Sequence, residues 1–157
     1  MITITLDEKQ KARIKQYLND KRFVNAISKV LIKAGYDLED KIVENIYERA
    51  YNTGTLAQSW TVEQLDKLRV KVFTGEEYAE FVEFGTRPHY APIDALVRWA
   101  KIKFKLSSLK KAQEIGAKVW WKIAHKGTPE KRYFRDAVEK FNLNEYIDAL
   151  IKEWENV

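Results

Sequence analysis

Ser59, Glu83 and His89 are the three residue types of a hydrolase triad: a hydroxyl nucleophile, a carboxylate and an imidazole base. Ser59 does not lie in the Gly-x-Ser-x-Gly turn that presents such a nucleophile in α/β-hydrolases. No second acid, histidine or metal cluster accompanies Glu83 at a spacing useful for catalysis. The sequence therefore predicts that the protein is not an enzyme and has no catalytic residue.

Metal and cofactor chemistry has as little support. His89 and His125 are the only histidines and there is no cysteine, so a common zinc site would need carboxylate ligands as well. Instead, His89 is expected to pack in the loop between Pro88 and Pro92, and His125 to lie near a helix C-terminus, where its charge is favoured. A glycine-rich phosphate loop is also missing. We expect no metal, no cofactor and no small-molecule substrate.

Glu83 is a carboxylate between two apolar residues, Val82 and Phe84. A charge in apolar surroundings needs a partner. The sequence offers Arg87, Arg98 or a backbone N–H group. Two interpretations stay open: an ion pair that fixes the fold, or a salt bridge across a boundary between subunits.

Positive charge is concentrated in one segment. The chain has a net charge of +5, yet the segment from Arg98 to Arg135 has twelve Lys or Arg against Glu114 and Glu130, so it carries +10 and the rest carries −5. Such asymmetry is typical of a surface that faces an acidic partner or nucleic acid, although a solvated helix face explains it as well. The candidate contact residues are Arg98, Lys101, Lys103, Lys105, Lys110, Lys111, Lys118 and Lys122.

Three tryptophans, Trp99, Trp120 and Trp121, lie within this basic segment. Aromatic and basic side chains together can bind single-stranded nucleic acid by stacking. Their spacing is also that of a helix, which favours packing in a core or contact between subunits.

The first half of the chain predicts a strand, two helices and a hairpin. Residues 1–4 alternate like a strand, and Thr5 to Glu8 has the capping-box form at the start of a helix to about Leu18. Asn19 and Asp20 can then cap a helix of some 28 residues to about Tyr51, which has one apolar stripe. Gly35 is unfavourable inside a helix, so close packing or a bend is expected there. Strands follow at 55–62 and around 68–72, joined by a turn at 63–67.

The second half predicts helices. Residues 78–85 fit a short helix or a strand. Pro92 suits the first turn of the next helix, Ser107 or Ser108 caps another, and Asn142 restarts the last one after a short helix around 134–141. The fold class is therefore α+β, a long N-terminal helix on a small antiparallel sheet followed by C-terminal helices. With 157 residues and few Gly or Pro, we expect one domain over residues 1–157.

Four segments, taken in order, resemble the tail-component family of long-tailed phages and their proviruses. Residues 52–60, NTGTLAQSW, are similar to its "TG-x-L-x-x-S" motif, and residues 78–86, YAEFVEFGT, to its "YA-x-x-VEFGT" motif. Pro88, His89 and the helix with ALVRW at 95–99 follow. Residues 127–137 resemble the closing "GT-x-P…P-F-L-x-x-A", with Tyr133 where the family usually has proline. The likeness spans about residues 25 to 140, and its signature residues are Gly54, Leu56, Ser59, Tyr78, Glu83, Phe84, Gly85, Thr86, Gly127 and Phe134.

This resemblance implies a structural protein of the virion that joins the head to the tail or completes the tail end. Its expected partners are copies of itself in a ring and neighbouring neck or tail proteins, with non-specific contact to passing DNA. Its expected location is the neck or tail of the virion, assembled in the host cytoplasm. The chain has no run of 18 apolar residues and no leader-like N-terminus, so neither a membrane span nor a signal peptide is expected. The alternative is a non-specific nucleic-acid-binding module that uses the basic segment 98–135.

Overall fold

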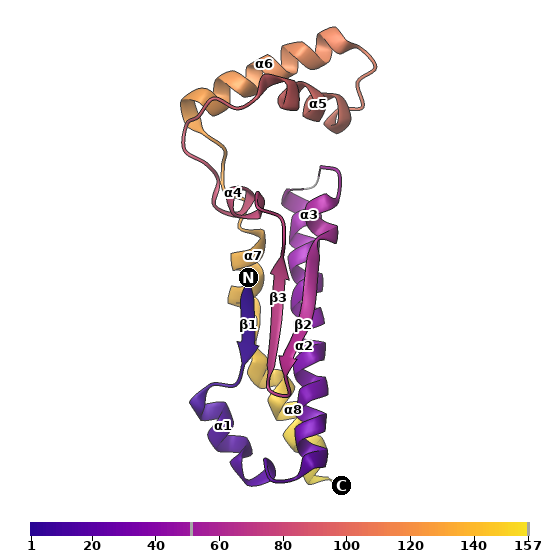
Figure 1. Ribbon diagram of the computed structural model, residues 1–157, viewed down its shortest axis with the longest axis vertical. Coiled ribbons are helices and arrows are strands. Elements are labelled where there is room, and N and C mark those ends of the chain that lie inside the picture. The colour runs from indigo at the N-terminus through magenta and orange to yellow at the C-terminus, as the bar shows by residue number, and fades with distance from the viewer. Residues whose placement is uncertain (51, 157) are drawn as a thin grey trace.

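A computed structural model describes residues 1–50 and 52–156, and shows an elongated molecule built along one long helix (Figure 1). The elements, in chain order, are β1 (Ile2–Thr5), α1 (Glu8–Ile14), the 3-10 turn η1 (Lys15–Tyr17), α2 (Lys21–Arg49), α3 (Thr55–Gln58), β2 (Trp60–Asp66), β3 (Arg69–Thr74), α4 (Ala79–Phe84), α5 (Ile93–Lys103), α6 (Leu109–Lys126), α7 (Tyr133–Lys140) and α8 (Leu143–Glu155). The α+β fold class is confirmed.

Helix α2 forms between its predicted boundaries because an apolar stripe and a cap support it. Asp20 accepts a hydrogen bond from the backbone N–H of Arg22. The helix ends at Arg49, and Tyr51, where its end was predicted, lies outside the described residues. The buried stripe consists of Phe23, Ile27, Leu31, Ala34, Leu38, Ile42 and Ile46.

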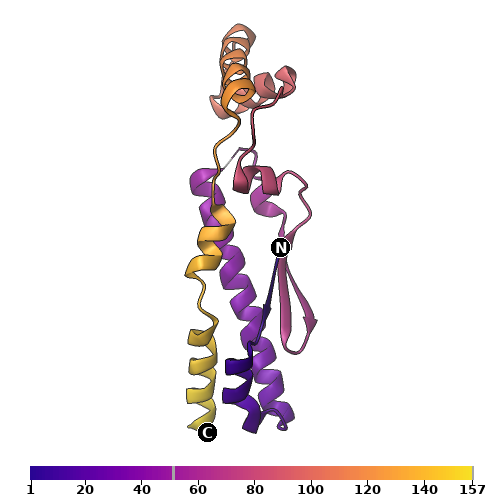
Figure 2. The same cartoon turned by 90° about the vertical axis from the view of Figure 1, so that its left-hand side faces the viewer.

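The core lies in three layers, with α2 in the middle. The antiparallel sheet, in the order β1-β3-β2, covers one side of α2, and α7 and α8 cover the other (Figure 2). A Cβ atom at Gly35 would lie 2.9 Å from Cγ1 of both Val62 and Val70. The predicted close packing at Gly35 is therefore confirmed: only a residue without a Cβ lets α2 approach the sheet so closely.

The predicted first strand, 55–62, was wrong in its first half, and so was the predicted turn at 63–67. Residues 55–58 form the helical turn α3, since Leu56 and Trp60 are four residues apart and fit a helical period as well as a strand period. β2 continues to Asp66 in antiparallel pairing with β3, and the Gln64 side chain also donates to the Ser28 Oγ of α2 (2.6 Å). The turn is Lys67–Leu68, where the Asp66 carboxylate accepts from the Leu68 N–H.

The predicted capping box was also displaced. Thr5 belongs to β1, and the cap of α1 is Asp7, whose carboxylate accepts from the Gln10 N–H while the Gln10 side chain accepts from the Asp7 N–H. α1 ends at Ile14 and continues as η1 rather than reaching Leu18 as one helix. Pro92 is the residue before α5 and not within its first turn. The predicted caps Ser108 and Asn142 are confirmed.

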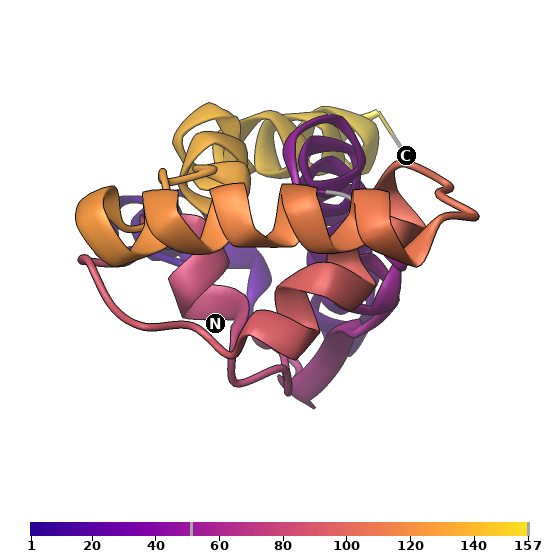
Figure 3. The ribbon, with the colours of Figure 1, turned by 90° about the horizontal axis from the view of Figure 1, so that it is seen from above.

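Helices α5 and α6 form a helical hairpin, residues 93–126, at one end of the molecule, and α6 crosses over that end (Figure 3). We call the part of the described chain up to Phe84 and from Arg132 onward the body. Within the described residues, no helix has both the length and the apolar character needed to cross a membrane.

Candidate assembly surfaces

The hairpin joins the body at a junction in which two chain segments pair at Thr86 and Thr128. We call this pairing the crossing. Their backbones form an antiparallel bridge, with Thr86 N–H donating to Thr128 O (3.1 Å) and Thr128 N–H donating to Thr86 O (3.2 Å). Gly85 and Gly127 flank the bridge at φ values of 71° and 72°, and a Cβ atom on either glycine would collide with the backbone of the opposite segment. Both signature glycines are therefore required by the crossing itself.

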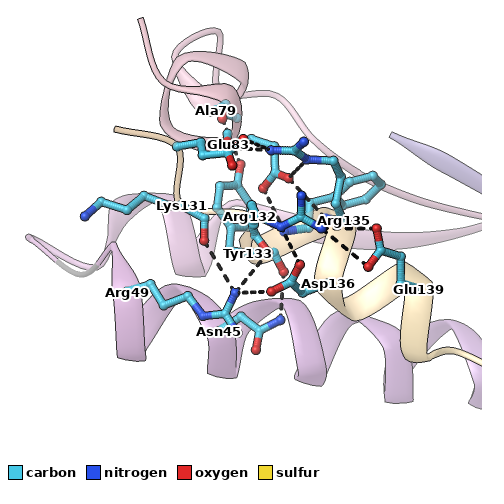
Figure 4. A network of polar contacts seen from close by, with 12 residues as sticks. Asn45, Arg49, Ala79, Glu83, Lys131, Arg132, Tyr133, Arg135, Asp136 and Glu139 are labelled. Carbon is cyan, nitrogen blue, oxygen red and sulfur yellow. Dashed lines mark hydrogen bonds and ion pairs between the residues drawn. The ribbon is translucent and has the colours of Figure 1, made fainter. Parts of the chain in front are cut away.

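On the body side of the junction, Glu83 is hydrogen-bonded to the N-terminus of α7. It is 3% exposed, and its carboxylate accepts from the backbone N–H groups of Phe134 (2.8 Å) and Arg135 (3.1 Å) and from Arg135 Nε (2.8 Å) (Figure 4). These N–H groups belong to the first turn of α7, whose own N-cap residue, Arg132, gives no side-chain cap. Glu83 thus caps α7 from a distant part of the sequence. A backbone N–H partner was among the predictions, but Arg87 and Arg98 were wrong: the guanidinium is that of Arg135.

A network of polar contacts extends from Glu83 to α2. The hydroxyl of Tyr133 donates to Ala79 O (2.9 Å), and burial, helped by the Glu83 charge, raises the Tyr133 pKa. Asn45 Nδ2 donates to Tyr133 O (2.8 Å). Ion pairs with Arg49 (2.6 Å) and Arg132 (2.9 Å) lower the pKa of Asp136 below its usual range. Helices α2, α4 and α7 are therefore tied together directly below the hairpin.

The structure gathers six of the ten signature residues at this junction. Glu83, Gly85, Thr86, Gly127 and Phe134 lie there, and the Phe84 ring packs 4.7 Å below the Arg135 guanidinium. A second group, Gly54, Leu56 and Ser59, starts α3 and β2: Gly54 has a φ of 89°, Leu56 is buried, and the Ser59 hydroxyl donates to Leu56 O. Trp60 stacks on Phe134 with centroids 5.5 Å apart and so connects the two groups. Tyr78 lies at the edge of the surface described below.

The triad residues do not converge. Ser59 Oγ contacts Thr74 Oγ1 (2.6 Å), and His89 Nδ1 contacts Arg87 O (2.9 Å). The Glu83 carboxylate is hydrogen-bonded to the first turn of α7. His125 lies in the last turn of α6, as expected, with its Nδ1 2.8 Å from Trp121 O. Among residues 1–50 and 52–156, no group of three His, Asp or Glu side chains could hold a metal ion.

The hairpin has a thin core. α5 and α6 approach closely where Gly116 meets Val97, since a Cβ at Gly116 would lie 2.8 Å from Val97 Cγ2. The buried residues of the two helices are Ala100, Ala112, Gly116 and Ile123. Of the three tryptophans, Trp99 and Trp120 are half-buried, whereas Trp121 is 56% exposed and stacks on His125 with centroids 4.3 Å apart.

The basic segment 98–135 was wrong as a description of one surface. Residues 93–126 carry nine Lys or Arg against Asp94 and Glu114, a net +7, so the rest of the chain carries −2. Arg132 and Arg135 belong to the body, where Asp136, Glu139, Glu83 and Glu130 neutralise them. The eight candidate contact residues between Arg98 and Lys122 all lie on the hairpin or on the loop between its helices.

An apolar surface runs from α4 to the base of the hairpin. Phe81 is 62% exposed and Tyr90 82% exposed. Phe81 also lines a groove of about 400 Å³ between α4 and the hairpin, together with Tyr78, Val82, Leu96, Trp99, Val119 and Ile123. We call this the α4 groove.

Sequence reasoning missed Phe81 and Arg135. Residues 78–85 fitted a helix or a strand equally, and only a helix puts Ala79 and Glu83 on the inner face and Phe81 on the outer one. No local signal pairs Arg135 with Glu83, because the two residues are 52 positions apart.

The fold is that of a small α+β protein with an apolar groove and a basic helical hairpin next to the junction. Residues 8–85 match the family model described as "Bacteriophage HK97-gp10, putative tail-component". This match, which runs from α1 to the first junction glycine, confirms the resemblance to the HK97-gp10-like family of phage tail components. The likeness of segments 88–140 lies beyond the match and stays a prediction. No curated protein and no solved structure matches the chain.

Proposed function

We propose that this chain is the head–tail joining or tail-completion subunit of a long-tailed phage or provirus, and that it acts in a ring. The family match supports a tail component. A ring needs a heterologous contact between two different surfaces of the same chain, repeated until it closes. Its place would be the neck or tail of the virion, after assembly in the host cytoplasm.

The observation that carries this proposal is the α4 groove. Single exposed apolar residues are common on protein surfaces, but a contiguous apolar surface with large aromatic side chains is typical of a protein interface. Phe81 projects from the outer face of α4 and is 62% exposed, so most of its ring is open to contact with another subunit. In the ring, the α4 groove of one subunit would receive its neighbour.

Negative-stain microscopy of the purified chain, alone and mixed with its tail partners, tests the proposal, and rings are the expected result. Phe81→Asp should abolish the rings with little change in melting temperature, because the side chain is mostly exposed. Tyr36→Asp is the matched control, since Tyr36 is a similarly exposed aromatic on a helix, α2, away from the groove. Rings that form equally well with Phe81→Asp would contradict the role of the groove, and a chain that never enters virions would contradict the function.

A further inference from the structure

The outward side of α6 carries a row of lysines. Ala112, Gly116 and Ile123 turn toward α5, and the opposite side of the helix is exposed. We call this exposed side the α6 outer face, and it consists of Lys110, Lys111, Glu114, Lys118, Trp121, Lys122 and His125. At 1.5 Å per residue, the lysines from Lys110 to Lys122 span roughly 18 Å along the helix. Helix α6 itself lies across one end of the molecule (Figure 3).

The lysines of this face are unneutralised. Lys110, Lys111, Lys118 and Lys122 form no ion pair with any residue in 1–50 or 52–156. Glu114 is the one acidic residue among the seven, against four lysines. Uncompensated charge held on a thin projection creates a positive potential that attracts a polyanion.

The type of cation on the α6 outer face favours DNA over an acidic protein as its ligand. Protein–protein interfaces are enriched in Arg and depleted in Lys, because Lys is strongly hydrated and lacks the planar fork of Arg. All four cations of the α6 outer face are lysines. Lysine suits a phosphate backbone, where a mobile point charge replaces condensed counterions and no fixed geometry is needed.

We propose that the α6 outer face binds the phosphate backbone of duplex DNA, without sequence preference. The contact goes beyond ring formation, since one subunit carries the whole face. Four lysines that each neutralise a phosphate give a slope of about −3.6 in a plot of log affinity against log salt, at about 0.9 per contact. Dissociation constants should lie at about 10⁻⁴ to 10⁻⁶ M near physiological salt.

Fluorescence anisotropy of a labelled 30-base-pair duplex, titrated with the full chain at several salt concentrations, tests this proposal. Lys118→Gln/Lys122→Gln should reduce the slope by about 1.8. Lys21→Gln/Lys29→Gln is the matched control: it removes the same charge from exposed positions on α2 that form no ion pair with a described residue, and its slope should equal that of the wild type. The substituted positions are all exposed, so each variant should fold.

Three results would overturn the proposal. One is no binding of the wild type at about 50 mM salt, and another is an equal loss of slope in both double variants, which would make the effect one of net charge alone. The third is unchanged DNA binding by Lys118→Gln/Lys122→Gln together with lost assembly on tail partners, because the face would then bind an acidic protein. Ring formation is scored separately by microscopy, so failure of the ring and failure of DNA binding can be told apart.

Discussion

The body and the hairpin of this chain differ in the size of the side chains that they bury and in the pairing of their cations. The body buries large apolar side chains such as Phe23, Leu38 and Ile46, and many of its cations form ion pairs. These paired cations are Lys11, Arg13, Arg22, Lys33, Lys41, Arg49, Arg69, Lys71, Arg132 and Arg135. The hairpin buries mainly small residues and leaves the lysines of α6 unpaired.

This difference assigns stability mainly to the body and exposed surface for contacts mainly to the hairpin. Burial of large apolar side chains is the main favourable contribution to folding, so the body supplies most of the free energy of unfolding. The hairpin has little core of its own and depends on the crossing at Thr86 and Thr128 for its position. The lysines of the α6 outer face and the α4 groove at the base of the hairpin stay exposed.

The largest effect is expected when a buried side chain is truncated to alanine, once in the body and once in the hairpin. Leu38→Ala should lower the free energy of unfolding by about 2–5 kcal/mol, because it leaves a cavity in the layer between the sheet and the C-terminal helices. Ile123→Ala should speed hydrogen exchange of α5 and α6 amides while global denaturation changes much less. Chemical denaturation and native-state hydrogen exchange measure the two quantities. Equal global losses would show that both regions form one cooperative core.

The next effect concerns the junction. Glu83→Ala should lower the free energy of unfolding by about 3 kcal/mol, because it leaves the first-turn N–H groups of α7 and the Arg135 guanidinium without their buried partner. Glu130→Gln is the control, since Glu130 is a half-exposed partner of the same arginine, and its effect should be much smaller. If the two variants lose equal stability, the capping role of Glu83 is wrong.

The smallest effect is a pH dependence confined to the body. Arg49 and Arg132 lower the pKa of Asp136 below its ordinary value of 3.8, so its contribution to stability is present above that value and is lost as the pH falls through the lower, folded value. Asp136→Asn should therefore make the loss of stability below about pH 4 shallower. Asp94→Asn is the control, because it removes a carboxyl group from the hairpin without breaking an ion pair between described residues. Chemical denaturation of the wild type and both variants at several pH values measures the free energy of unfolding in each case.

Local signals in the sequence predicted the body well and the junction poorly. The stripe of α2, the cap at Asp20 and the tight approach at Gly35 follow from periodicity and from side-chain size over a few residues. Glu83 needed a partner, but its choice of Arg135 and the α7 N-terminus depends on how chain segments far apart in sequence meet. The same reason explains why segment 98–135 did not form one basic surface: Arg132 and Arg135 lie beyond the crossing and face body carboxylates.

Hydrogen exchange of the free chain and of the chain assembled into tails tests the central claim most directly, namely that the body holds the fold while the α4 groove and the hairpin make the contacts. The account predicts slower exchange in α4, α5 and α6 on assembly and little change in α2 and β3, which are already buried in the free subunit. Unchanged exchange in α4, α5 and α6, with protection gained elsewhere on the body, would contradict it.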